Sequence, residues 1–74
     1  MATSTLDAMG LKCPLPVLRA RKAMKPLASG EILEVLTTDP DSLVDFQNFC
    51  ETTGDTLLVS EEKDGVFRFE IKKA

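Results

Sequence analysis

Two proline-marked helix starts constrain the fold of this chain more than any other feature of its sequence. The first is Cys13-Pro14-Leu15-Pro16 and the second is Asp39-Pro40. Proline suits the first turn of a helix, because its missing N–H would have no intrahelical partner there and its fixed φ favours a helical start. The sequence therefore predicts one helix over residues 14–27 and a second over residues 40–52, with Asp39 as the N-cap of the second.

Four segments with the pattern of strands surround these helices. They are Ser4 to Ala8, Glu31 to Thr38, Thr56 to Lys63 and Val66 to Lys72, and Asp64-Gly65 between the last two is a hairpin signal. The order β-α-β-α-β-β contains two crossover units, so we expect the first three strands to run parallel and the hairpin to add an antiparallel strand. We predict an α/β (α+β) two-layer sandwich, with a mixed four-stranded sheet and both helices on one face, as a single domain of residues 1–74.

Apolar residues recur at helical spacing in both predicted helices. The first has Val17, Ala20, Met24 and Leu27 with Leu18 and Ala23 beside them, and the second has Leu43, Phe46 and Cys50 with Phe49 beside them. Both helices should return antiparallel to the strands and so run parallel to each other, which places Cys13 at the start of one helix and Cys50 at the end of the other. A helix of about 12 residues is about 18 Å long. A disulfide needs Cα atoms within about 7 Å, so we expect two free thiols, with Cys50 buried as a packing residue.

Cys13 is the candidate functional residue. At a helix start its sulfur would lie near first-turn amides and the positive end of the helix dipole, which lowers the pKa of a thiol. Pro14 and Pro16 remove two of those amides, so the N–H groups of Leu15 and Val17 are the expected donors. We expect a modestly activated, exposed thiol on a turn that the two prolines make stiff.

Basic residues cluster around this cysteine in the sequence. Residues 1–28 carry five basic side chains against Asp7 alone, while residues 29–74 carry eleven acidic side chains against four basic ones. Lys12 and Arg19 should add positive potential that favours the Cys13 thiolate, and Arg21 and Lys22 should belong to a docking surface. The carboxylates of Asp41, Asp45 and Glu51 are interpreted as a solvated helix face that complements the dipole, without a chemical role.

Composition excludes several classes of site. There is no histidine, which excludes Cys-His and Ser-His-Asp catalytic units within the chain. Two cysteines with neither a Cys-x-x-Cys motif nor histidine predict no metal site. The N-terminal residues lack the basic and apolar regions of a signal peptide, and no apolar run approaches the roughly 20 residues of a membrane span. We expect a cytoplasmic protein with reduced thiols and no membrane partner.

Several segments of the sequence resemble those of a known family. Leu6 to Leu18, with its Gly-Leu-Lys-Cys-Pro-Leu-Pro core, is followed by Arg21-Lys22, Asp39-Pro40, Asp45, Cys50, Leu57-Leu58 and Phe69 to Lys72. Together they look like the TusA/SirA family of sulfur carrier proteins, and the match covers essentially the whole chain. The CPxP signature is specific when it follows a short strand and Gly-Leu in a chain of this length.

The resemblance implies a β-α-β-α-β-β two-layer fold and a persulfide carried on Cys13, with no other cofactor. It also implies a sulfur donor, either a cysteine desulfurase or a rhodanese-like protein. The acceptor would be a protein with a reactive cysteine, such as a DsrE-type relay, in tRNA thiolation, sulfur oxidation or molybdenum cofactor synthesis. Leu15 stands between the prolines where some tRNA-thiolation members have Glu, and it resembles carriers from sulfur-oxidising organisms. Such a sulfurtransferase-type carrier need not be an enzyme in the strict sense.

A second class of function remains open. The basic first helix could bind RNA or a partner protein, and the predicted fold resembles the C-terminal domain of a bacterial translation initiation factor. The protein is acidic overall and has no Tyr or Trp for base stacking, so direct nucleic-acid binding is not expected. A regulatory adaptor acting through this helix would work without the Cys13 thiol, which separates it from a carrier.

Overall fold

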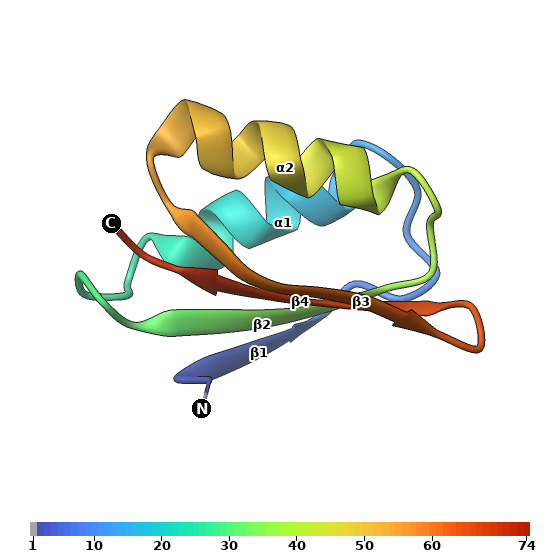
Figure 1. Ribbon diagram of the computed structural model, residues 1–74, viewed down its shortest axis with the longest axis horizontal. Helices are drawn as coiled ribbons and strands as arrows, with labels where there is room; N and C mark the ends of the chain where they lie inside the picture. The colour runs from blue at the N-terminus through green and yellow to red at the C-terminus, as the bar shows by residue number, and fades with distance from the viewer. Residues whose placement is uncertain (1) are drawn as a thin grey trace.

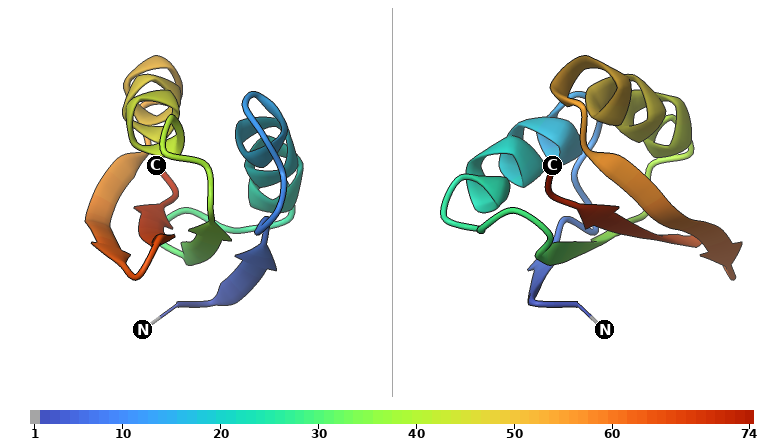
Figure 2. Two further views of the ribbon diagram at one scale, coloured as in Figure 1. Left: turned by 90° about the vertical axis from the view of Figure 1, so that its right-hand side faces the viewer. Right: turned by 60° about the vertical axis from the view of Figure 1, so that its left-hand side comes forward.

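The protein forms two layers, a four-stranded sheet and a pair of helices that cover one of its faces (Figure 1, Figure 2). The computed structural model describes residues 2–74, so residue 1 of the predicted domain lies outside the described residues. Its elements are β1 (Ser4–Asp7), α1 (Leu15–Met24), β2 (Ile32–Thr37), α2 (Ser42–Thr53), β3 (Thr56–Lys63) and β4 (Val66–Lys72). The predicted two-layer sandwich with a mixed sheet is confirmed, and both hairpin strands have the predicted bounds.

The strands lie in the order β1-β2-β4-β3. β1 pairs with β2 in parallel, with Leu6 opposite Val35. β4 is antiparallel to both of its neighbours, β2 and β3. The first three strands therefore point the same way, as predicted, but β3 is at an edge because the returning strand of the hairpin takes the position beside β2.

α1 ends three residues before its predicted end. Its last residue is Met24, and Pro26 follows too closely for another turn because proline has no N–H to donate. The Leu27 N–H donates to the Met24 carbonyl oxygen at 3.1 Å. The Lys73 ammonium group donates to the same oxygen at 2.9 Å and to the Lys25 oxygen at 3.2 Å. A cation therefore sits at the negative end of the α1 dipole.

α2 begins two residues after the predicted start. Its first residue is Ser42 and its N-cap is Asp41, so the prediction of Asp39 as the N-cap was wrong. Asp39 instead accepts the Asp41 N–H on Oδ1 at 3.0 Å, which closes a local turn before the helix. At its other end α2 stops at Gly54, whose φ of 82° is accessible to glycine at little cost.

The core lies between the sheet and the helices and depends on aromatic packing. Phe46 and Phe69 are fully buried with ring centroids 4.8 Å apart, and Phe49 meets Phe46 edge to face at 6.4 Å. Ala20, Met24 and Cys50 are buried beside them, as their spacing predicts. Leu18 and Leu43 were expected on the same faces, but they are 53% and 37% exposed. Pro16, on the inner side of α1, is buried.

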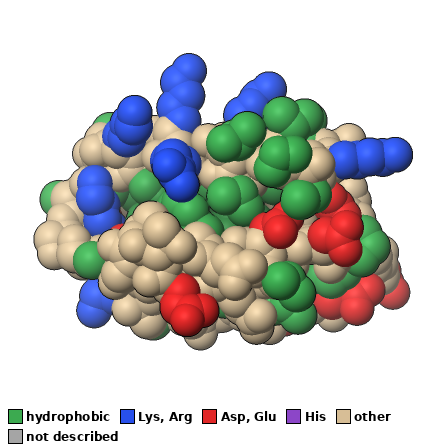
Figure 3. Space-filling model, turned by 90° about the horizontal axis from the view of Figure 1, so that it is seen from above, with side chains coloured by type: hydrophobic (Ala, Val, Ile, Leu, Met, Phe, Trp, Pro, Cys, Tyr) green, Lys and Arg blue, Asp and Glu red, His purple; other side chains and the backbone are tan. Residues whose placement is uncertain are grey.

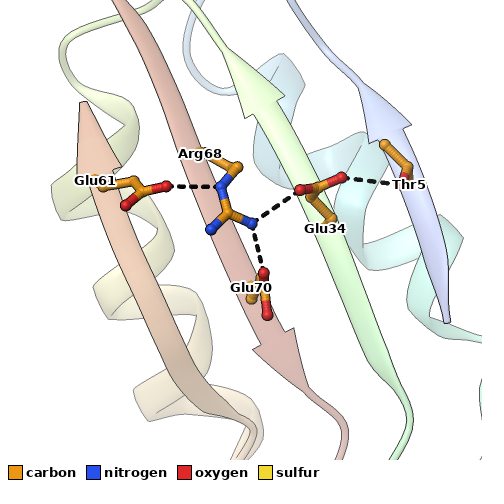
Figure 4. A network of polar contacts seen from close by, with 5 residues as sticks. All are labelled: Thr5, Glu34, Glu61, Arg68 and Glu70. Carbon is orange, nitrogen blue, oxygen red and sulfur yellow. Dashed lines mark hydrogen bonds and ion pairs between the residues drawn. The ribbon is translucent and has the colours of Figure 1, made fainter. Parts of the chain in front are cut away.

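The face of the sheet away from the helices carries a charged network (Figure 4). Arg68 on β4 pairs with Glu61 of β3 at 2.7 Å, with Glu34 of β2 at 2.9 Å and with Glu70 of its own strand. The Thr5 hydroxyl on β1 donates to the remaining oxygen of Glu34 at 3.1 Å. This chain of contacts crosses all four strands and keeps the open face polar.

We predict that Phe46→Ala removes a large share of the stability of the domain. Truncating a buried phenylalanine costs about 3 to 5 kcal/mol, and a small domain has only about 5 to 15 kcal/mol in total. Urea denaturation should show this loss in the free energy of unfolding. Val44→Ala is the control, because Val44 on the same helix is 57% exposed and its truncation should cost under about 0.5 kcal/mol. Equal losses in the two variants would contradict the packing described.

Candidate functional site

Cys13 lies in the loop between β1 and α1, immediately before the N-cap residue Pro14. Its thiol is free and exposed, whereas Cys50 is free and buried on α2. The expectation of two unpaired thiols with Cys50 in the core is confirmed. The peptide bond between Cys13 and Pro14 is cis.

Two hydrogen bonds join the Cys13 loop to the loop between β2 and α2. The backbone N–H of Cys13 donates to Asp39 Oδ2 at 2.5 Å. The N–H of Gly10 donates to the Thr38 hydroxyl at 2.9 Å. Both loops leave the same edge of the sheet, because β1 and β2 are parallel neighbours. The chain therefore brings residues 26 and 28 positions apart into one site.

The first amide of α1 does not serve the thiol. The Leu15 N–H donates to the Lys12 carbonyl oxygen at 2.9 Å, so the expectation that it would donate to the sulfur was wrong. This hydrogen bond closes a short turn over residues 12–15 that contains Cys13. The helix start thus orders the loop through its backbone.

Carboxylates dominate the electrostatics of the thiol. The nearby Asp45 carboxylate is the largest cause that raises the pKa of Cys13 to about 11, because it favours the protonated thiol, which can donate a hydrogen bond to it. Desolvation and the negative charges of Asp45, Asp39 and Asp41 act in the same direction. The prediction of a pKa lowered by nearby basic residues was wrong. Asp45, which was interpreted as part of a solvated helix face without a chemical role, is one of the groups that shift the pKa of Cys13.

The reason lies in the tertiary structure. Closeness in sequence placed Cys13 among basic residues, but the loop after β2 places the start of α2 beside it. The hydrogen bonds that Asp39 accepts from the backbone N–H groups of Asp41 and Cys13 lower the pKa of Asp39. The positive charge of Lys12 adds to this effect. The surroundings of Cys13 therefore favour its protonated thiol.

The predicted supporting residues occupy different positions. Lys12 lines a cavity with Cys13. Arg19 and Lys22 are exposed on α1 and line neither of the two cavities next to Cys13 or Pro14. Arg21 lines the second of these cavities, with its guanidinium carbon 5.9 Å from the centre of the Phe49 ring. The role of Arg19 in the potential at Cys13 stays a prediction.

One opening is lined by Cys13 and a second by the next residue, Pro14. The larger, of about 520 Å³, lies between the two loops, and its lining includes Lys12, Cys13, Thr38, Asp39 and Asp41. The smaller, of about 240 Å³, runs between the helices from Pro14 and Asp45. The larger opening leaves the Cys13 side chain accessible from outside the protein.

The helix side of the molecule separates its charges (Figure 3). Most basic side chains lie in the upper half of that view and most acidic side chains gather at its lower right, with apolar side chains between them. Exposed apolar residues at the starts of the helices and in the loop before α1 are Met9, Leu15, Leu18, Leu43 and Val44. The cysteine is thus set in a surface with apolar, acidic and basic parts.

Among residues 2–74, no three or more His, Cys, Asp or Glu side chains are arranged to hold a metal ion. None of the helices described is both long and apolar enough to cross a membrane. The chemistry that this arrangement offers is that of an accessible thiol beside a carboxylate.

Known proteins resemble this chain over most of its length. The family model described as sulfurtransferase TusA matches residues 4–73. The sulfur carrier protein TusA of Allochromatium vinosum is 51% identical over 69 residues, which are 93% of this chain and 91% of that protein. The crystal structure of a SirA-like protein from Desulfitobacterium hafniense superposes with a TM-score of 0.84 at 36% identity, covering 95% of this chain and 96% of that one.

We predict that Asp45→Asn lowers the pKa of Cys13 and speeds its alkylation. The asparagine removes a negative charge that opposes the thiolate, and each unit of pKa change alters the thiolate fraction about tenfold below the pKa. Iodoacetamide labelling followed from pH 7 upward measures this, with an expected rate increase of about tenfold at neutral pH. Glu51→Gln is the control, because Glu51 is on α2 but is not among the groups that shift the pKa of Cys13. An unchanged pH profile in Asp45→Asn would rule out this role of the carboxylate.

Proposed function

The chain belongs to the TusA family of sulfur carrier proteins, and from this premise we propose that Cys13 accepts a sulfane sulfur and relays it to a protein thiol. The observation that carries the proposal is the contrast between the two cysteines. Cys13 is exposed beside an open cavity, while Cys50 is 6% exposed in the core. Exchange at sulfur requires access of one sulfur to another, which Cys13 has and Cys50 lacks.

Loading is a substitution at the outer sulfur of a donor persulfide. The Cys13 thiolate attacks that sulfur, a new S–S bond forms on Cys13, and the donor's own S–S bond breaks to release a donor thiolate. In delivery, an acceptor thiolate attacks the outer sulfur on Cys13, and the Cys13 thiolate leaves. Each bond broken is replaced by one formed, so transfer of the sulfur atom consumes no external oxidant and needs no cofactor beyond the persulfide itself.

Asp45 keeps the Cys13 thiol protonated until a partner docks, because its carboxylate is the largest cause of the raised pKa of Cys13. A cation that a partner brings to this carboxylate would oppose that effect and favour the Cys13 thiolate that attacks the donor. A persulfide on Cys13 would extend into the opening lined by Lys12, whose cation favours the anionic form of the outer sulfur. Pro14 and Pro16 hold the loop and the helix start that present it.

The partners follow from this chemistry. The donor is a protein that carries a persulfide, such as a cysteine desulfurase or a rhodanese-like protein, and the acceptor is a protein with a reactive cysteine, such as a DsrE-type relay. The acceptor decides whether the sulfur reaches tRNA thiolation, sulfur oxidation or cofactor synthesis. Because the cycle needs Cys13 as a reduced thiol, the cytoplasm is the compartment that suits it.

One observation favours the adaptor as a second candidate. Ion pairs among residues 2–74 all centre on Arg68, so the exposed basic side chains of α1 are available to a partner. An adaptor would keep its activity in Cys13→Ser and lose it when Arg19 and Lys22 are reversed in charge. A carrier would lose its activity in Cys13→Ser alone.

We predict that a donor loads one sulfur atom onto Cys13. The protein is incubated with a cysteine desulfurase and cysteine, or with a rhodanese and thiosulfate, and intact-protein mass spectrometry follows its mass. The wild type should gain one sulfur atom and lose it again with a reductant. Cys50→Ala is the matched control, because it removes the other thiol while filling a buried position with a small apolar side chain, and it should load like the wild type.

Cys13→Ser should show no gain with either donor. A gain that persists in Cys13→Ser, or one that disappears in a folded Cys50→Ala protein, would contradict the assignment of the carrier thiol. Circular dichroism of each variant establishes that the proteins compared are folded.

A further inference from the structure

A groove runs between the two helices and starts beside the reactive cysteine. Its α1 side consists of Pro14, Val17 and Arg21, and its α2 side of Asp45, Asn48, Phe49 and Thr52. These residues recur every three or four positions on both helices, which run side by side in the same direction (Figure 1, Figure 2). The groove therefore has an acidic end at Asp45, an apolar middle and a basic end at Arg21.

Arg21 is the charge at the far end of this groove. Its guanidinium lies over the Phe49 ring at 5.9 Å, a contact that orients an arginine while leaving its donors exposed. The ion pairs within residues 2–74 all involve Arg68 instead, so Arg21 has no carboxylate partner there. Lys25, the C-cap residue of α1, lies about one turn beyond Arg21 and adds to the positive potential. The groove is complementary to an anionic group at this end and to an apolar side chain in the middle.

We propose that this groove binds an extended segment of a partner protein, whose reactive cysteine meets Cys13 while an acidic side chain of the same segment pairs with Arg21. This inference rests on the proposed function, because it names the kind of partner that Cys13 serves. Asp45 at the near end repels a carboxylate next to the partner's cysteine, so the groove also selects against acidic residues at that position.

The length of the groove sets the spacing in the partner. Pro14 and Arg21 are seven residues apart on a helix, which is about 10 Å at 1.5 Å per residue. An extended chain advances about 3.3 Å per residue. The acidic side chain should therefore stand three or four residues from the partner's cysteine, with an apolar residue between them over Val17 and Phe49.

Short peptides test this spacing directly. The protein carries Cys13 as a mixed disulfide with thionitrobenzoate, and each peptide thiolate attacks the Cys13 sulfur, forms a new disulfide and releases the coloured thionitrobenzoate anion. The peptides are acetylated and amidated and contain one cysteine, with a glutamate one, three, four or eight positions away on either side. Matched peptides carry lysine instead. Each rate is divided by the rate of the same peptide with a small thionitrobenzoate disulfide, which corrects for its thiol pKa.

Two pairs of variants assign any preference to the groove. Arg21→Glu reverses the charge at its basic end, and Lys63→Glu makes the same change in the exposed β3–β4 hairpin. Asn48→Trp fills the middle of the groove, and Gln47→Trp places the same side chain on the neighbouring exposed position of α2, which does not line it. All four positions are exposed, so the fold should tolerate each change.

We expect glutamate at three or four positions to react about two- to fivefold faster than adjacent glutamate or matched lysine at low salt, the range of an exposed ion pair. Arg21→Glu and Asn48→Trp should abolish the preference, and the two controls should keep it. Rates that do not depend on spacing, a preference for lysine, or a preference that survives Arg21→Glu would overturn the proposal. Because Cys13 is activated chemically, these outcomes judge the groove independently of persulfide loading.

Discussion

The hydrogen bond from the Cys13 backbone N–H to Asp39 is the contact on which the rest of the site depends. It joins the loop after β1 to the loop after β2, and these loops are neighbours because the two strands are parallel and adjacent. Asp39 also accepts the Asp41 N–H, so a single carboxylate orders both the cysteine loop and the approach to α2. The position of Asp45 relative to the thiol follows from this arrangement, since α2 starts where that loop ends.

In the free protein the surroundings of Cys13 therefore favour the protonated thiol and do not activate it. Carboxylates that hold Cys13 neutral reduce its reactivity toward oxidants and alkylating agents, because the thiolate is the reactive species. The same carboxylates attract a cation, so a partner that brings a lysine or arginine to Asp39, Asp41 or Asp45 would favour the thiolate at the moment of contact. Reactivity would then depend on docking, which suits a protein that must pass sulfur to some thiols and not to others.

The sequence predicted the fold well because its elements are defined locally. Proline at each helix start, Asp64-Gly65 in the hairpin and the spacing of Phe46 and Cys50 all act through neighbouring residues. The insertion of β4 beside β2 could not be derived in this way, because strand order depends on pairing between distant segments. The chemistry of Cys13 was misjudged for the same reason. Basic residues near it in sequence were visible, whereas Asp45, 32 positions away, comes near only through α2. The uneven distribution of charge along the sequence was a usable signal. Acidic side chains are concentrated after residue 28, in the part of the chain that includes the start of α2.

The proposed function makes Cys13 Sγ the atom to which the transferred sulfur is bonded. A crystal structure of the protein after reaction with a persulfide donor tests it most directly, at a resolution that shows single sulfur atoms. We expect one additional sulfur bonded to Cys13 Sγ. It should extend into the opening that Lys12 and Asp39 line, and Cys50 should be unchanged in the core. Added sulfur on Cys50, or a loaded protein in which Cys13 carries none, would contradict it.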